Sequence, residues 1–474
     1  MSIVGKFGVR HVQAFLLSCA LVVNHMHLGN LGMAVVVITQ KHNERQWKRI
    51  FYTETVDPMS DNVTYASAAF FYAQMLFSII GGYLSTKINN KLLLLISSIV
   101  SFLVSYLTPT LVNIFEWKAF FFIRLVQGAT QGFVKPVVYN LAARWLPTEE
   151  MLLLGPAIIC GLYTGVCFML MMGGYLGAGH GGWHSIFYFS GNCGLLWSLA
   201  FYGLGFASPN DCYYISELEK NHINDNVPPS ILAPYRHNIP WRKIFSNIPL
   251  WTVLVCQFAN NWSFNVFVKI WPVYLQHKLH FELHETGIIC GTPFLFVSIT
   301  VYAATILFHY LWNYGKLNFV VVRHVCNAIA QFGAAYSFMV CSSSEKILVT
   351  VIFHHIGVLI SSLQLFGFYM NYYDLSPTYV GLTSGICNGI ASIASIVGPH
   401  VTLDMYNQYG QDEEAWTKDR QFIGWRKGYD LCSLIFFIGG TAFMFLGQVK
   451  RQEFDNNEQK KQVKKNIISW STKP

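Results

Sequence analysis

The sequence predicts an all-α polytopic membrane protein with twelve transmembrane helices in two six-helix lobes. Hydrophobic residues make up 53% of the chain and charged residues only 12%, against about 25% charged in a typical soluble domain. Apolar runs of about twenty residues, the length that crosses a bilayer as a helix, recur along the whole chain. They lack the alternating pattern of barrel strands, so helices must satisfy the backbone hydrogen bonds in lipid.

Each of the twelve spans is a mainly apolar run bounded by polar or turn-forming residues. The first run follows Lys6 and Arg10 and is too long for a cleavable signal peptide, so we expect it to be retained. The spans are expected near 12–39, 65–86, 92–112, 119–143, 151–177, 184–207, 247–277, 286–312, 317–341, 347–370, 377–404 and 427–448.

A long polar interruption divides the spans six and six. The predicted domains are an N-terminal lobe (1–207), a linker (208–246), a C-terminal lobe (247–448) and a tail (449–474). Two similar halves joined by a linker are typical of secondary transporters, which bind substrate between the halves near the midplane. A membrane enzyme or a scaffold is the alternative at this point.

The loops predict the orientation. An even number of spans places both termini on one side, which carries about 17 Lys and Arg against about 11 opposite, so we expect both termini in the cytoplasm. The sequon at Asn62 lies in the opposite polar loop and predicts a glycosylation site. A second sequon, at Asn261, falls inside a span and should not be modified.

The composition argues against several classes of site. Eleven cysteines are scattered without metal-ligand spacing, so neither a metal site nor a cofactor is expected, with Na⁺ left open as a coupling ion. A basic patch interleaved with aromatic residues, as for nucleic acid, is missing from the sequence. The spans also lack paired carboxylates or a nucleophile with a base, so an enzyme is not expected. The predicted partners are the lipid bilayer and a small anionic substrate, and the protein is expected to be a monomer.

Three cations fall well inside the predicted spans: Arg124, Lys135 and Lys269. Placing each of these charges inside the membrane costs about 2.5 kcal/mol or more in free energy, unless the charge has a partner or faces a water-filled cavity. The sequence places no Asp or Glu at the same depth, so an anionic substrate is the expected partner. A fourth cation, Arg323, lies near a helix end, where snorkelling would bring its charge to the interface.

Helical spacing groups these cations with amides. Gln131 and Lys135 return to the face of Arg124, and Asn261, Asn265 and Lys269 recur at i,i+4 spacing. The alternative is that both lysines snorkel and Arg124 binds backbone carbonyls. Four histidines are candidates for a proton relay, because imidazole titrates near neutral pH. The competing interpretation is that they are packing residues. They are His25, His27, His354 and His355.

Several strings resemble one family of carriers. In order along the chain they include "RLVQGATQG" (124–132), "SPNDCYYISELEKNHI" (208–223), "PWRKIF" (240–245), "NYYDLSP" (371–377) and "GICNGIASIASIVGP" (385–399). From about residue 9 to 448 the chain resembles the anion:cation symporter branch of the major facilitator superfamily, which includes sodium/phosphate cotransporters, sialin and vesicular glutamate carriers.

The resemblance implies a two-lobed twelve-helix fold and alternating-access transport of an anion, with Arg124 in the substrate cavity. Asn388, in the last matching string, joins the candidate binding residues. Other family residues are replaced: the first-helix arginine by Leu28, a second-helix histidine by Ser67, and a seventh-helix arginine by Asn260. Gln131 stands where sialin-like members carry the glutamate associated with proton coupling, which disfavours a carboxylate-based proton relay.

The expected function is therefore secondary active transport of a small inorganic or organic anion, phosphate-cotransporter-like and sodium-coupled. Proton-linked export of acidic sugars or amino acids from an endolysosome is one alternative. A membrane sensor or scaffold that transports nothing is the other, since several motif residues are altered. The expected location is the plasma membrane or an endolysosomal membrane.

Overall fold

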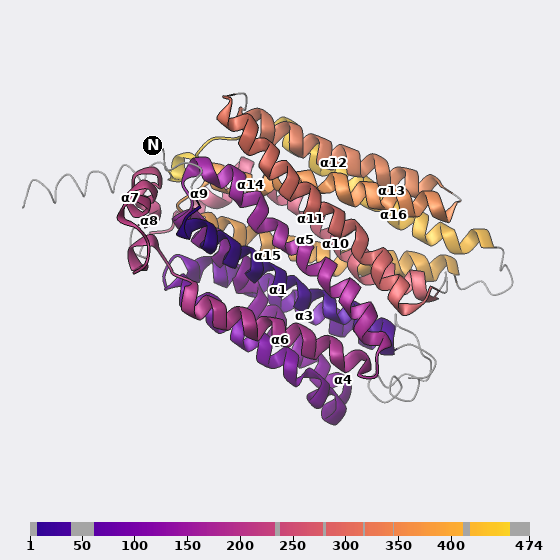
Figure 1. Cartoon of the computed structure of the whole chain (residues 1–474). Coiled ribbons are helices and arrows are strands. Elements are labelled where there is room, and N and C mark those ends of the chain that lie inside the picture. Colours follow the sequence, from indigo (N-terminus) through magenta and orange to yellow (C-terminus); the bar gives the residue numbers. More distant parts are fainter. Residues whose placement is uncertain are drawn as a thin grey trace, which may run out of the picture.

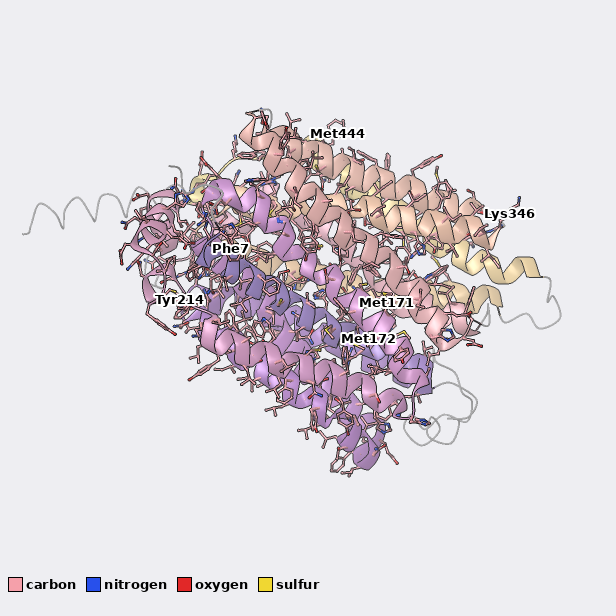
Figure 2. The ribbon with its side chains drawn as sticks, viewed as in Figure 1. Phe7, Met171, Met172, Tyr214, Lys346 and Met444 are labelled. Atoms are coloured by element: carbon pink, nitrogen blue, oxygen red, sulfur yellow. The ribbon has the colours of Figure 1, made fainter. Side chains whose placement is uncertain are left out.

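The computed structural model describes residues 7–38, 61–232, 238–277, 281–315, 318–344, 346–410 and 418–455. Its long helices run side by side between two ends (Figure 1). One end, called the linker end below, carries η2 (Pro209–Asp211), α7 (Glu217–Asn226), α8 (Pro229–Leu232) and α9 (Trp241–Phe245). Figure 2 shows Phe7 and Tyr214 at the linker end and Lys346 at the opposite end, called the far end.

The N-terminal half contains five long helices that form six spans. The fourth predicted span follows the third without a break in helix assignment, because only Glu116 leaves the helical region, with φ 58° and ψ −144°. This residue lies in the turn that the sequence predicts between spans 92–112 and 119–143. The helices are α1 (Val9–Ile38), α3 (Asp61–Ser85), α4 (Asn90–Trp145), α5 (Thr148–Ala178) and α6 (Gly182–Leu204).

The C-terminal half supplies six further spans. These are α10 (Ile248–His277), α11 (Leu283–Asn313), α12 (Phe319–Ser343), α13 (Ile347–Ser361) with η3 (Ser362–Leu365) and α14 (Phe368–Leu375), α15 (Val380–Gly410) and α16 (Lys418–Leu446). Within the described residues, 9 helical segments pass as membrane spans by length and hydropathy alone. The second half of α4, α6 and α10 complete the predicted twelve, and the all-helical fold class is confirmed.

The tenth predicted span, 347–370, is interrupted rather than continuous. A Cβ at Gly367 would lie 2.8 Å from Cβ of Asn327 on α12, so only glycine permits this approach. Arg323 donates a hydrogen bond of 3.0 Å to the carbonyl of Phe366 beside the break, and its guanidinium pairs with Asp374 at 2.7 Å. The expected snorkelling of Arg323 is wrong: its side chain is 3% exposed, and the partly exposed carboxylate of Asp374 neutralises its charge.

The two halves touch at both ends through glycines. At the linker end, a Cβ on Gly385 of α15 would lie 2.6 Å from the Ser78 carbonyl oxygen and 2.9 Å from Cα of Gly82 on α3. At the far end, a Cβ on Gly174 of α5 would lie 3.0 Å from Cα of Gly287 on α11. Because glycine has no side chain, the two helix backbones approach each other closely at both contacts. Between these two contacts the interface is lined by the polar residues described next.

Candidate functional site

The intramembrane cations form two polar layers. Arg124 and Lys135 both lie on the second half of α4, and a rise of 1.5 Å per residue separates them by about 16 Å along the helix. Their side chains contact different partners on different helices. The Arg124 layer lies nearer the far end, and the Lys135 layer nearer the linker end.

In the Arg124 layer, one buried guanidinium is held by neutral groups. Arg124 is 1% exposed. Its Nη1 donates to Gln127 Oε1 at 2.8 Å, to Asn30 Oδ1 at 3.2 Å and to the carbonyl oxygen of His27 at 3.3 Å. Its Nε has no hydrogen-bond partner among the described residues. These contacts orient the guanidinium without neutralising its charge.

Lys269 approaches the same layer from the other half of the protein. Its Nζ lies 4.0 Å from the ring centroid of Phe71 on α3, while the guanidinium of Arg124 lies 5.0 Å from the ring of the adjacent Phe70. The two phenylalanine rings contact each other edge to face at 5.0 Å. Arg124 and Lys269 thus contact the two rings of one aromatic pair. Cation–π contacts contribute about 0.5–2 kcal/mol each, which does not substitute for a counter-ion.

The Lys135 layer is a hydrogen-bond network across the interface. Lys135 Nζ donates to Asn388 Oδ1 at 3.3 Å, and Gln257 Nε2 donates to the same oxygen at 3.1 Å. Asn388 Nδ2 in turn donates to Ser78 Oγ at 2.9 Å, and the Tyr372 hydroxyl donates to Gln257 Oε1. The network joins α3 and α4 of one half to α10, α14 and α15 of the other.

Other candidates on these helices lie outside both networks. Gln131 is 1% exposed, and its amide atoms have no hydrogen-bond partner among the described residues. Asn265 Nδ2 donates to the Asn261 carbonyl oxygen and to Ser395 Oγ, each at 2.9 Å, within the C-terminal half. The residues that helical spacing placed on one face are thus spread along the helix axis, since a shared face does not imply a shared site.

The four histidines make separate contacts. His27 Nε2 lies 3.0 Å from the Ser190 carbonyl oxygen, and His355 Nδ1 lies 2.7 Å from the Val351 carbonyl oxygen. His354 stacks on Trp271 with ring centroids 4.9 Å apart, and its Nδ1 lies 3.1 Å from the Tyr429 hydroxyl. These contacts are those of packed residues, and a relay through them stays a prediction.

His25, the fourth histidine, is also buried, at 4% exposed. Its Nδ1 has no hydrogen-bond partner among the described residues, and its ring lies 6.1 Å from that of Phe264. Within the part of the chain that the structure describes, groups of His, Cys, Asp or Glu able to hold a metal ion are absent.

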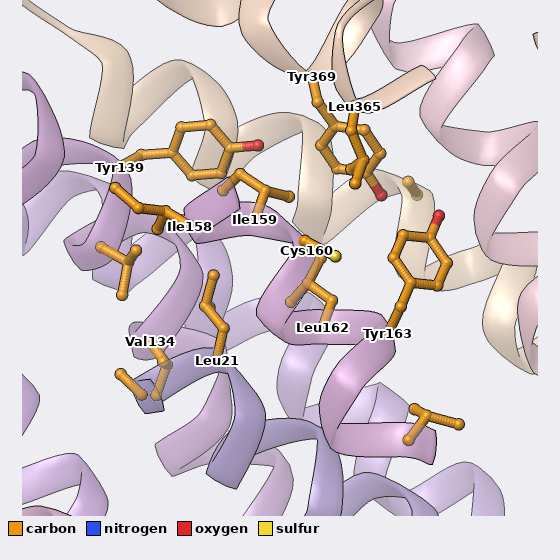
Figure 3. Packing of buried hydrophobic residues seen from close by; sticks show 14 of the residues in the cluster. Leu21, Val134, Tyr139, Ile158, Ile159, Cys160, Leu162, Tyr163, Leu365 and Tyr369 are labelled. Carbon is orange, nitrogen blue, oxygen red and sulfur yellow. The ribbon is translucent and has the colours of Figure 1, made fainter. Parts of the chain in front are cut away.

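Asn260 stands where the resemblance implies an arginine, and a neutral network surrounds it. Its Nδ2 donates to the Tyr369 hydroxyl at 3.0 Å, and its Oδ1 accepts from Tyr163 and Gln364. Figure 3 shows the hydroxyls of Tyr163 and Tyr369 turned toward each other. The cation on this helix is Lys269, about 13 Å further along α10.

Sequence reasoning missed the partners of the cations. Gln127 could have been found, since it follows Arg124 at i,i+3 spacing. Asn30 was visible as a polar residue in the apolar first span. Phe71 and Gln257 carried no signal in the sequence, because aromatic and amide residues in apolar runs are common and only the tertiary fold selects these two.

Comparisons with known proteins agree with this architecture. Residues 17–399 match the family model described as Major Facilitator Superfamily. Vesicular glutamate transporter 2.2 of Danio rerio is 24% identical over 421 residues, which cover 87% of this chain and 69% of that protein. Vesicular glutamate transporter 2 of Homo sapiens is 22% identical over 445 residues, which cover 93% of this chain and 74% of that protein.

Solved structures show the same fold. The proton:xylose symporter XylE bound to 6-bromo-6-deoxy-D-glucose superposes with a TM-score of 0.65 at 12% identity, covering 94% of this chain and 98% of that one. A bacterial homologue of the human lysosomal transporter Spinster, in an inward-facing and unoccupied conformation, gives a TM-score of 0.61 at 12% identity, covering 96% and 99%.

The chain therefore belongs to the major facilitator superfamily, and it is a multi-pass membrane transporter and not an enzyme. The vesicular glutamate transporters that it matches are members of the anion:cation symporter group of that superfamily. These relatives agree with the anion:cation symporter resemblance that the motifs indicate.

Proposed function

We propose that this transporter carries a small anion, bound between the two halves by Arg124 and Lys269. The observation that carries the proposal is the charge of Arg124, which is buried among Asn30, Gln127 and a backbone carbonyl, with no carboxylate among its contacts in the described residues. An uncompensated cation at this depth costs several kcal/mol. An anion that contacts both Arg124 and Lys269 would remove that cost for both cations.

The substrate class follows from the donors. A guanidinium and an ammonium suit a carboxylate or a phosphate group. The relatives are named as glutamate transporters, which supports an organic carboxylate as substrate. Inorganic phosphate fits the same donors. Asn260 and its tyrosines offer neutral hydrogen-bonding groups near the midplane for the remainder of an organic substrate.

For energy coupling we propose sodium, with proton-linked export as the alternative. Gln131 is an amide where a proton-carrying carboxylate would be needed, and neither polar layer has a carboxylate among its described contacts. This supports coupling that does not depend on a titrating acid in the spans.

The decisive experiment is flux into proteoliposomes. Labelled phosphate and labelled glutamate are offered separately under a sodium gradient, under a pH gradient and under a potassium diffusion potential. We expect flux that requires sodium. In Arg124→Gln the flux should fall at least about a hundredfold, because the buried charge-assisted contact between the guanidinium and the anion is lost. The matched control is Lys220→Gln in the linker, where a cation 27% exposed pairs only loosely with Glu217. Wild-type flux in Arg124→Gln would refute the assignment.

We propose that the linker end faces the cytoplasm, as the distribution of Lys and Arg among the loops predicts. Asn62 lies in the first turn of α3, at the far end, where a sequon is accessible to glycosylation only if that end faces the lumen or exterior. Its side chain lies outside the described residues. A glycosidase-sensitive mass shift that is lost in Asn62→Gln would support this orientation; the same shift after introduction of a sequon in the linker would reverse it.

A further inference from the structure

A small cavity lies between the halves in the Lys135 layer, one level closer to the linker end than Arg124. Its lining comes from α1, α4 and α5 of one half and from α10, α14 and α15 of the other, and it includes Lys135, Tyr139, Ile159, Gln257, Tyr369 and Asn388. This lining contains one cation and no carboxylate.

Two donors in the lining are not fully used. The ammonium of Lys135 has three hydrogens and makes one described hydrogen bond, to Asn388 Oδ1 at 3.3 Å. The hydroxyl of Tyr139 is buried, with the residue 4% exposed, and has no hydrogen-bond partner among the described residues. Figure 3 shows this hydroxyl directed toward Ile159 and Tyr369, which also line the cavity. A buried phenol normally has a partner, so an unused one facing a cavity indicates a missing acceptor.

The surrounding groups hold these donors in place. The acceptor Oδ1 of Asn388 is shared with Gln257, and Nδ2 of Asn388 is engaged by Ser78. The rings of Tyr372 and Tyr373 pack on Tyr139 at 5.6 and 5.3 Å. The cation and the phenol are therefore fixed by both halves of the protein, whereas the donor atoms themselves remain available to a ligand.

The geometry points to a second anion station, in which Lys135 Nζ and the Tyr139 hydroxyl together bind the carboxylate or oxyanion group of the transported substrate. It rests on the proposed function, since it is a stage in the path of the anion that Arg124 and Lys269 bind. The two stations are about 16 Å apart along α4, so a phosphate-sized anion occupies one at a time. We call this second station, which lies nearer the linker end, the inner station. Its two ligands lie on α4, but Asn388 of the other half is bonded to Lys135, so an arriving anion also replaces part of that contact between the halves.

The test separates a ligand role from a structural one. Tyr139→Phe removes a hydroxyl that bonds to no described residue, so it should leave the melting temperature of the anion-free protein unchanged. We expect it to raise the concentration of anion needed for half-maximal stabilisation about tenfold, because a charge-assisted hydrogen bond is lost. Lys135→Gln should raise it further. Tyr373→Phe, whose ring packs on Tyr139 but does not line the cavity, is the matched control.

The measurement is thermal unfolding of the purified full chain, titrated with sodium phosphate, sodium glutamate or sodium chloride at matched ionic strength. Stabilisation by phosphate or glutamate that Tyr139→Phe weakens and Tyr373→Phe does not supports the station. Stabilisation by chloride alone would mean a separate inorganic-anion site and would overturn the path assignment. Equal titrations for Tyr139→Phe and wild type, or no stabilisation by any of the three salts, would overturn the station itself.

Flux measurements distinguish this failure from failure of the proposed function. Arg124→Gln should lose flux and keep the anion-dependent stabilisation that the inner station provides. If Arg124→Gln still transports the anion, the assignment of Arg124 as a substrate ligand fails. The titration of Tyr139→Phe then still tests the inner station independently. If wild type transports neither phosphate nor glutamate, the same titrations still decide whether the inner station binds them.

Discussion

Replacing Arg10 should be among the most destabilising single changes in this protein. Its Nε lies 2.6 Å from Glu150 Oε2, its Nη1 lies 3.0 Å from Glu219 Oε1, and its side chain is 1% exposed. Glu219, from linker helix α7, also accepts hydrogen bonds from the backbone N–H groups of Val9 and Arg10 at 3.0 Å each, at the start of α1. One guanidinium thus joins α1, α5 and the linker.

Arg10→Met keeps the volume of the side chain but leaves two largely buried carboxylates without their cation. Breaking a buried ion pair by removing one partner costs about 3–5 kcal/mol, and this cation serves two acids. Glu219→Gln should cost less, about 1–3 kcal/mol, because the amide oxygen can still accept from the start of α1. In the double variant one of the two unpaired charges is gone, so we expect the two costs to be less than additive by about 1–3 kcal/mol.

The assay is unfolding of the purified protein in mixed micelles, monitored by loss of helical signal, for wild type, both single variants and the double variant. Lys220→Gln serves again as the control on the same linker helix, since an exposed pair contributes about 0–1 kcal/mol. A change below about 0.5 kcal/mol in Arg10→Met, or strict additivity in the double variant, would refute the reasoning.

Two further predictions concern the interface between the halves. Gly385→Val should lower turnover at least about tenfold, because its Cβ would lie 2.6 Å from a carbonyl oxygen at the linker end and overpacking costs about 1–3 kcal/mol. The control is Gly203→Val, where the added side chain meets open space. Equal flux in both variants would contradict the expectation. Phe71→Leu should lower the stability of the anion-free protein by about 0.5–2 kcal/mol through loss of the contact with Lys269. Thermal unfolding should show that saturating phosphate or glutamate reduces this difference, and a difference that persists unchanged with anion would speak against Lys269 as a ligand.

The spans could be predicted from sequence because lipid imposes one simple rule on each of them. About twenty apolar residues make a span wherever they occur, and the helix ends mostly lie within a few residues of those expected. The break after Ser361 could not be predicted, since "SSLQLFGFYM" continues an apolar run. It depends on the approach of Gly367 to Asn327, two residues that meet only in the folded protein.

The candidate site was predictable only in its charges. A cation in a span is rare enough to be noticed, so Arg124, Lys135 and Lys269 could be identified from sequence. Their partners come from other helices, and periodicity along one helix says nothing about them. Arg10 shows the opposite error: in sequence it is a flanking charge that indicates topology, whereas the folded linker buries it between two acids.

The two glycine contacts bear on how an anion could pass between the stations. Near the linker end α3 packs closely against α15, near the far end α5 packs closely against α11, and these pairs share no helix. One pair can therefore separate while the other stays packed, provided that the halves tilt as rigid bodies. Ser78 lies beside the linker-end contact and also holds Asn388. Separation there would pull Ser78 from Asn388 and loosen the hold on Lys135. Opening of the linker end is thus coupled to the inner station, and opening of the far end is expected to leave that station intact.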